Sequence, residues 1–311
     1  MSSTPCEVIW ASSRPEPVLT NLQPTAQKPA RVVVLGALGF IGGTILRRLQ
    51  AEGINLLALD LPAFDLLAPD AAPTLAAALR PTDTLIFISA RAPCKNNAML
   101  LDNLRMAEAV CAALRRQPVG HVIYQSSDAV YRDVREPMTE ASCAEPGTLH
   151  GLMHLAREVM LKSEFSGPLT FIRPTLVYGL NDPHNGYGPN RFRRLAAEGR
   201  EIVLFGEGEE LRDHVCVDEL GELARLVVLH RSVGIANAVT GDVVSFRQLA
   251  EFTAAQFPSR VAVKGSPRTG PMPHNGYRAF TPSAALRAFP GFRFTPWREG
   301  LARECARMKA S

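Results

Sequence analysis

The sequence predicts an α/β fold, a doubly wound parallel sheet with a smaller C-terminal lid. From residue 31 onward, short apolar segments rich in β-branched residues alternate with amphipathic helical segments, which is typical of a parallel sheet covered on both faces. A glycine-rich turn follows the first of these strands. After Gly179 the alternation gives way to short, proline-rich segments, which indicates a lid over the carboxyl edge of the sheet.

The first five strands are expected at Arg31–Gly36, Asn55–Asp60, Thr84–Ala90, His121–Ser127 and Leu169–Gly179. The helices between them are expected at about 40–53, 74–80, 98–116 and 149–163. Further along, the pattern predicts a helix at 191–200, a strand at 201–206 and a helix at 217–230.

Composition excludes several classes of protein. The chain has 311 residues, of which 46% are hydrophobic, and a net charge of +4 without a Lys/Arg cluster, so no nucleic-acid partner is expected. No apolar run approaches the roughly 20 residues of a membrane-spanning helix, so no membrane association is expected. The six cysteines are scattered and form no CxxC pair, which favours reduced thiols in the cytoplasm.

Gly36, Gly39 and Gly42 form G-x-x-G-x-x-G between the first strand and the first helix. A turn that grips a pyrophosphate needs glycine, because the backbone bends sharply and approaches the phosphates closely, while the helix N-terminus offers free N–H groups. The acidic residue that such a site needs roughly 20 residues further on is Asp60. Its carboxylate would accept hydrogen bonds from the adenosine ribose and repel a 2′-phosphate. The predicted cofactor is therefore NAD.

Composition and the strand–helix alternation predict three parts of the chain. Residues 1–30, rich in proline and polar residues, form an N-terminal extension. Residues 31–179 form an NAD-binding Rossmann domain, to which 201–230 return. Residues 180–200 and 231–311 form a substrate-binding lid.

Between Arg31 and about Leu301 the chain resembles the extended short-chain dehydrogenases/reductases, the family of NAD-dependent sugar epimerases and dehydratases. GALGFIG resembles the family's TGxxGFIG, and three further segments resemble SSxxVYG, RPxNVYG and RDFVYVDD, at Ser126–Tyr131, Arg173–Gly179 and Arg212–Leu220. WREGL, at Trp297–Leu301, resembles the start of a C-terminal helix in this family.

The resemblance implies roles for individual residues. It implies cofactor contacts by Gly36, Gly39, Phe40, Ile41, Gly42, Asp60, Asp65, Leu66, Ser89, Ala90, Arg91 and Asn103. It implies that Ser127 binds the reacting hydroxyl and that Arg212 binds a substrate diphosphate. From their place at the start of the helix after the Gly/Pro-rich loop, Arg191 and Arg193 are expected to add positive charge there. The resemblance further implies a sugar or nucleotide-sugar substrate and a homodimer.

The chain departs from the family where the chemistry takes place. The family uses Tyr and, four residues later, Lys, and the aligned segment here is EPGTLHGLMHLARE, which places His150 at the Tyr position and His154 at the Lys position. Leu176 also replaces the Asn of RPxNVYG, and Arg132 follows Tyr131 where the family has Gly.

Three interpretations of the two histidines stay open. In the first, His150 is the general base, since imidazole has a pKa of about 6.5 and needs no activating cation, and His154 donates to the nicotinamide ribose. In the second, the chain is a catalytically silent NAD-binding regulatory or scaffolding subunit, or uses another residue such as Tyr131 or Tyr178. In the third, the histidines bind a metal with Cys143 as the candidate third ligand. Histidines without a role are the remaining interpretation, and we expect no metal.

Overall fold

The structure is a computed structural model, and it describes residues 18–310. Its strands are β1 (Thr20–Asn21), β2 (Val32–Leu35), β3 (Leu56–Leu59), β4 (Thr84–Phe87), β5 (His121–Gln125), β6 (Leu169–Pro174), β7 (Leu176–Tyr178), β8 (Ile202–Phe205), β9 (Leu211–Cys216), β10 (Ser232–Ala238), β11 (Val243–Ser245), β12 (Val263–Ser266) and β13 (Tyr277–Arg278). Its α-helices are α1 (Phe40–Ala51), α2 (Ala71–Ala78), α3 (Asn97–Arg116), α4 (Leu149–Glu164), α5 (Pro189–Ala197), α6 (Val217–Leu229), α7 (Phe246–Ala255), α8 (Ser283–Ala288) and α9 (Trp297–Ala310).

Seven strands form the central sheet, in the order β1-β10-β6-β5-β4-β2-β3. All neighbours are parallel except β1, which runs antiparallel to β10. From β2 the chain moves first to β3 on one side and then to β4 on the other. Such a switch leaves a crevice at the carboxyl ends of the strands, where ligands bind in folds of this class.

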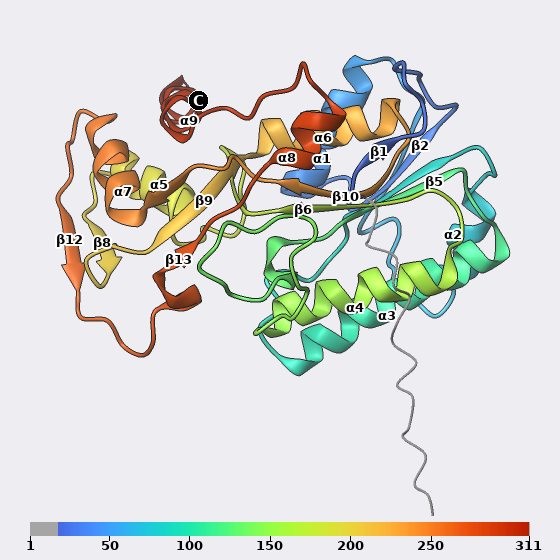
Figure 1. The fold of residues 1–311 in the computed structure, drawn as a ribbon, viewed down its shortest axis with the longest axis horizontal. Coiled ribbons are helices and arrows are strands. Elements are labelled where there is room, and N and C mark those ends of the chain that lie inside the picture. The colour runs from blue at the N-terminus through green and yellow to red at the C-terminus, as the bar shows by residue number, and fades with distance from the viewer. Residues whose placement is uncertain (1–17, 311) are drawn as a thin grey trace, which may run out of the picture.

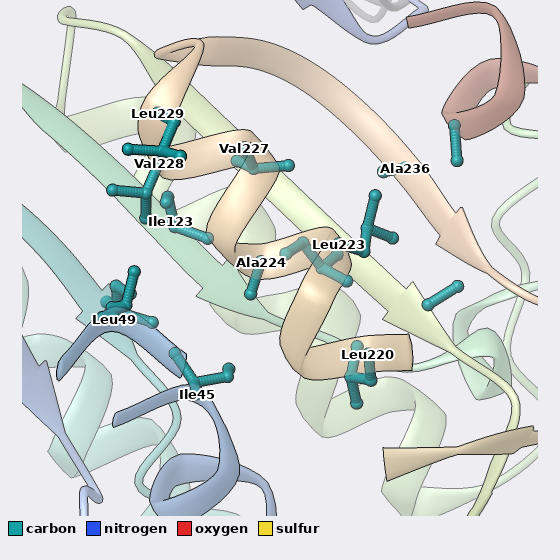
Figure 2. Packing of buried hydrophobic residues seen from close by; sticks show 14 of the residues in the cluster. Ile45, Leu49, Ile123, Leu220, Leu223, Ala224, Val227, Val228, Leu229 and Ala236 are labelled. Carbon is teal, nitrogen blue, oxygen red and sulfur yellow. The ribbon is translucent and has the colours of Figure 1, made fainter. Parts of the chain in front are cut away.

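Helices cover both faces of this sheet, with α1, α6 and α8 on one face and α2, α3 and α4 on the other (Figure 1). Figure 2 shows Ile45 and Leu49 of α1 beside α6, which contributes Leu223 to the same buried cluster. The two helices cross closely at Gly221, where an added Cβ would lie 2.9 Å from Cγ2 of Thr44. Burial on both sides explains why a central strand such as β2, VVVL, is continuously apolar.

The segment predicted as a lid has its own core, built around Phe192, Leu204, Phe246, Leu249 and Trp297. Strand β8, which carries Leu204, packs in this core, whereas the sequence pattern returned residues 201–230 to the Rossmann domain. In Figure 1 helices α5 and α7 lie beside β8 and β12, at one end of the central sheet. Strand β9 connects the lid to the rest of the molecule, because it pairs with β11 and β13 on its two sides and also with β7. The loop between β7 and α5 therefore lies at the junction of sheet and lid.

Strand β10 lies in the central sheet, whereas the sequence pattern assigned residues 231–311 to the lid. Its sequence, SVGIANA, lacks the run of large apolar residues that marks β2 and β3. Two of its buried polar side chains make hydrogen bonds of 2.7 Å: the Ser232 hydroxyl donates to Asn21, and Oδ1 of Asn237 accepts from the hydroxyl of Tyr131. Polar side chains that form specific hydrogen bonds can occupy a core strand that composition alone does not mark.

Within the described residues, no helix combines the length and the apolar character needed to cross a membrane. Residues 1–17 of the predicted N-terminal extension lie outside the described residues.

Candidate functional site

A cavity of about 680 Å³ opens at the carboxyl ends of the parallel strands. Most residues that the sequence assigned to cofactor and catalysis line it. From the phosphate turn, the second strand and the loops after it come Gly36, Gly39, Phe40, Ile41, Gly42, Asp60, Asp65 and Leu66. From the later strand ends and helix α4 come Ser89, Ala90, Arg91, Ser127, His150 and His154.

The phosphate turn is sterically restricted to glycine at two positions. Gly36 has a φ of +86°, and a Cβ on it would lie 2.7 Å from the backbone nitrogen of Ser89. A Cβ on Gly42 would lie only 1.9 Å from the carbonyl oxygen of Gly36. Because α1 therefore starts very close to the end of β2, and its residues Phe40–Gly42 line the cavity, the N-terminus of α1 suits an anion bound there.

Asp60 shapes the same turn from the end of β3. Its carboxylate accepts hydrogen bonds from the backbone N–H of Leu38 at 2.7 Å and of Leu61 at 2.8 Å. A carboxylate has about four acceptor sites, so two remain for ribose hydroxyls. Asp65 accepts from the N–H of Leu67, which fixes the loop that carries Leu66 into the cavity.

The loop after β4 is held from behind by Asn103. The Asn103 side chain accepts from the backbone N–H of Arg91 and donates to its carbonyl, each at 2.9 Å. Asn103 is fully buried and is not among the residues that line the cavity. The structure thus places Asn103 behind the loop that carries Ser89–Arg91, where it fixes the shape of the loop.

Ser127 lies at the end of β5 and is 9% exposed. Its hydroxyl accepts from the N–H of Ala129 at 3.1 Å and lies 3.4 Å from the carboxylate of Asp128. Asp128 is paired with the buried guanidinium of Arg278, which reaches across from the lid. The Ser127 hydroxyl is held by the short turn that follows β5.

The two histidines lie one turn apart on α4, with ring centroids 4.7 Å apart and nearly perpendicular. Burial lowers the pKa of His150, against the opposing effect of the Asp128 carboxylate. Burial also lowers the pKa of His154 well below its usual value, with added effects from His150 and Arg157. Both rings are therefore neutral at neutral pH.

Each ring has one hydrogen bond to protein. The backbone N–H of Cys94 lies 3.4 Å from Nδ1 of His150, longer than an ordinary hydrogen bond. The hydroxyl of Tyr124 lies 2.7 Å from Nδ1 of His154. His150 is thus weakly held and His154 firmly held.

The two arginines proposed for substrate lie outside the cavity lining. Arg191 is exposed on α5. Arg212 is buried on β9, where its Nη1 donates to Glu210 at 3.0 Å and its Nε has no partner among the described residues. The lid residues that do reach the cavity are Asp182 and His184, from the loop before α5.

The described residues provide no third ligand for a metal between the histidines. The one group of three potential ligand atoms among them is Cys216, Asp218 and Glu304, far along the chain from α4. That group is paired with Arg303 and Arg307.

Comparison with known proteins matches this arrangement. Residues 32–239 match the model of the NAD dependent epimerase/dehydratase family. The chain belongs to this family. It is therefore an extended short-chain dehydrogenase/reductase, as the sequence motifs indicated, and its cofactor is NAD.

Two similar proteins catalyse different reactions, one an epimerisation and the other a reduction. A UDP-glucose 4-epimerase of Mycolicibacterium smegmatis is 26% identical over 224 residues, which cover 61% of this chain and 70% of that protein. A dTDP-4-dehydro-6-deoxy-D-allose reductase of Streptomyces bikiniensis is 25% identical, over 72% of this chain and 80% of that one. The structure of a Thermus thermophilus UDP-glucose 4-epimerase in complex with NAD has the same fold, with a TM-score of 0.79 and 22% identity over 90% of this chain and 99% of that one.

The cavity fits NAD on the chain's own geometry. The restricted glycine turn suits a pyrophosphate, and the carboxylate of Asp60 suits the adenosine ribose. Apolar side chains of Leu38, Phe64 and Leu66 line the part next to Asp60, where a purine ring can pack. Ser127, which follows β5, and the two histidines of α4 line the cavity too, and in the sheet β4 and β2 separate β5 from β3, which Asp60 follows.

Sequence analysis missed two residues next to His154, Tyr124 and Arg157. Tyr124 precedes the Gln-Ser-Ser segment on β5, and Arg157 follows His154 by one helical turn on α4. Helical spacing places Arg157 on the same face as His154, and this is the signal that could have identified it. Nothing local marked Tyr124, whose contact with α4 depends on how strand and helix pack.

We expect the substitution Gly42→Ala to weaken NAD binding about 10- to 100-fold while the protein stays folded. The added methyl cannot fit 1.9 Å from the Gly36 carbonyl, and strain of this kind costs about 1–3 kcal/mol. Calorimetric titration with NAD⁺ measures the effect.

The matched control is Gly43→Ala, one residue further along α1. Its Cβ would meet atoms at 3.5 Å or more, an ordinary contact. This variant should bind NAD⁺ as the wild type does. Equal affinities for both variants would contradict the assignment of this turn to the pyrophosphate.

Proposed function

We propose that the chain acts on a nucleotide sugar by transient oxidation of a carbinol carbon, with His150 as the general base. The observation that carries this proposal is the meeting of Ser127, a neutral His150 and the phosphate turn in one cavity. Epimerisation, dehydration and net oxidoreduction share this step, and it is the step for which these residues provide groups.

Ser127 and His150 have different roles at the reacting hydroxyl of the substrate. The Ser127 hydroxyl binds the substrate oxygen, and an unprotonated ring nitrogen of His150 takes the proton as the carbon–oxygen double bond forms. Bound NAD supplies the acceptor for the hydride that leaves the same carbon. A substrate hydroxyl can displace the long contact between Cys94 and His150, because that contact is weak at 3.4 Å.

His154 supports the nicotinamide half of the cofactor in this proposal. Its ring lines the cavity, and its Nδ1 is already engaged by Tyr124. This leaves Nε2 for the nicotinamide ribose. A neutral imidazole replaces the cationic amine of the usual lysine, which is not needed to activate a base that is unprotonated at neutral pH.

The substrate class rests on the named activities of the relatives and on the lid. A UDP-glucose epimerase and a dTDP-sugar reductase are among the similar proteins. The unpartnered Nε of Arg212 supports its proposed role as a ligand of the substrate diphosphate. Arg191 stays proposed as a further source of positive charge at the start of α5.

A second candidate function is a catalytically silent NAD-binding subunit. The absence of both Tyr and Lys at positions 150 and 154 favours it. The experiments below distinguish the two candidates.

We expect His150→Ala to lower kcat/KM roughly 10²- to 10⁴-fold without loss of NAD binding, since the base is removed and the dinucleotide turn is intact. The assay mixes enzyme, NAD⁺ and UDP- or dTDP-sugars and follows both the reduced-nicotinamide absorbance and the sugar products by chromatography. His230→Ala is the control, because His230 lies at the end of α6 and bonds to Gln23, outside the cavity.

Turnover that survives His150→Ala would remove the histidine from the base role. Wild-type protein that binds NAD⁺ without turning over any sugar nucleotide, and gains activity on combined His150→Tyr and His154→Lys substitution, would establish the silent subunit instead.

The pH dependence of kcat/KM should reflect His150. Since burial lowers its pKa below the ordinary value of about 6.5, the base is unprotonated at neutral pH and becomes protonated only in acid. We therefore expect kcat/KM to stay level from neutral to mildly alkaline pH and to fall as pH drops through a single ionisation below about 6.5. A rate that still rises steeply above neutral pH would point to a tyrosine base.

We further propose that the protein is a homodimer. Leu101 on α3 and Leu152 and Val159 on α4 are exposed, and the two helices lie side by side at one face of the molecule (Figure 1). Burying such a stripe against a second copy would remove apolar surface from water. Sedimentation velocity should give a dimer that Leu152→Glu converts to a monomer.

A further inference from the structure

We propose that Tyr124 and Arg157 fix His154 as the neutral tautomer with its proton on Nε2, so that His154 acts only as a hydrogen-bond donor to the cavity. The proposed effect of this tautomer on NAD binding rests on the proposed function. The assignment of the tautomer itself does not depend on that function. Tyr124 and Arg157 are positioning residues in this proposal, because neither lines the cavity.

The hydrogen bond between Tyr124 and His154 has two possible directions. The hydroxyl lies 2.7 Å from Nδ1, and both residues are buried. Either Tyr124 donates to Nδ1 and the imidazole proton is on Nε2, or Nδ1–H donates to Tyr124 and the hydroxyl proton needs another acceptor.

Both groups are neutral, so each has one proton to place. Burial raises the pKa of Tyr124 to about 12, although the charge of Arg157 opposes that rise. Burial lowers the pKa of His154 well below its usual value. A phenolate and an imidazolium are therefore excluded at neutral pH, and the choice is between the two tautomers.

The surroundings of Tyr124 favour donation to His154. Its ring packs against Phe87 and Phe171, at centroid distances of 5.3 and 6.3 Å. Among the described residues, Nδ1 of His154 is the acceptor recorded for its hydroxyl proton. In the opposite direction that proton would be buried without an acceptor, which costs about 1–3 kcal/mol and corresponds to a population ratio of roughly 5 to 150.

Arg157 adds an electrostatic preference in the same direction. Its guanidinium carbon lies 5.9 Å from the centre of the Tyr124 ring and 4.7 Å from that of Phe87. It is held there by hydrogen bonds of 2.9 Å to the carbonyls of Asn103 and Ser89. A fixed positive charge beside the phenol repels the hydroxyl proton, which directs it away from Arg157 and toward His154.

This assignment separates the roles of the two histidines. A neutral ring protonated on Nε2 and engaged on Nδ1 has no free lone pair for a metal or for a substrate proton. His154 can therefore be neither the general base nor a metal ligand, and the base of the pair is His150. The single fixed N–H of His154, on Nε2, would donate to the nicotinamide ribose one of the hydrogen bonds that the family's lysine donates.

The test combines a spectroscopic and a binding measurement on the full chain. In protein labelled with ¹⁵N on its histidine rings, correlation spectra show which ring nitrogen carries the proton, and a His154→Gln spectrum identifies the resonances. The wild type should show protonated Nε2 and unprotonated Nδ1 on His154. A proton on Nδ1 would overturn the proposal without reference to any variant.

Tyr124→Phe should change the His154 tautomer and weaken NAD⁺ binding about 3- to 10-fold, the net value of one hydrogen bond. Its affinity for ADP, which has the adenosine half and no nicotinamide ribose, should stay the same. Tyr187→Phe is the matched control and should change neither the tautomer nor the affinity, because it deletes a hydroxyl outside the cavity, which accepts from the backbone N–H of Phe205 at 3.0 Å.

The outcomes separate this inference from the proposed function. An unchanged tautomer and unchanged NAD⁺ affinity in Tyr124→Phe would refute the positioning role. Wild-type protein that binds NAD⁺ no more tightly than ADP would refute the proposed ribose contact of His154, while the spectrum would still decide the tautomer.

Discussion

The positions of Ser127, His150 and His154 in the cavity depend on one buried carboxylate, that of Glu158. It accepts from the hydroxyl of Ser126 at 2.6 Å and pairs through both oxygens with the guanidinium of Arg173. Its side chain is fully buried and that of Arg173 nearly so. Because an unpaired buried charge costs several kcal/mol, α4 cannot shift along the sheet without a large loss of stability.

Everything at the reacting end follows from that anchor. Glu158 lies on α4 one turn beyond His154 and two turns beyond His150, so fixing it fixes both rings. Its partner Ser126 directly precedes Ser127 at the end of β5. The hydrogen bond between Glu158 and Ser126 therefore fixes the position of the histidines on α4 relative to the hydroxyl of Ser127. The ion pair therefore acts on function through geometry, although it touches no ligand.

The sequence predicted the parts of this structure that local patterns determine. The apolar strands around Val33 and Leu85 and the glycine turn at Gly36 each leave a local pattern, and the structure has them where they were expected. Strand β10 was missed because its burial is supported by specific hydrogen bonds, such as that between Tyr131 and Asn237, and not by a run of large apolar residues.

The site residues also fall into those that a local sequence pattern predicts and those that it does not. Residues on the phosphate turn and on α4 could be named from spacing, since each motif is continuous in the chain. Asn103 proved to lie behind a loop, and Tyr124 beneath His154, because such placements depend on how helices α3 and α4 pack on the sheet. Arg191 and Arg212 illustrate the limit for long side chains, whose direction a motif does not specify.

The most direct test of the account is a crystal structure of the protein with NAD⁺. The account predicts the pyrophosphate on the turn at Gly36–Gly42, the adenosine ribose on Asp60 and the nicotinamide ribose within hydrogen-bond distance of Nε2 of His154. A cofactor whose nicotinamide end lies away from Ser127 and both histidines, or a metal ion coordinated between the two rings, would contradict it.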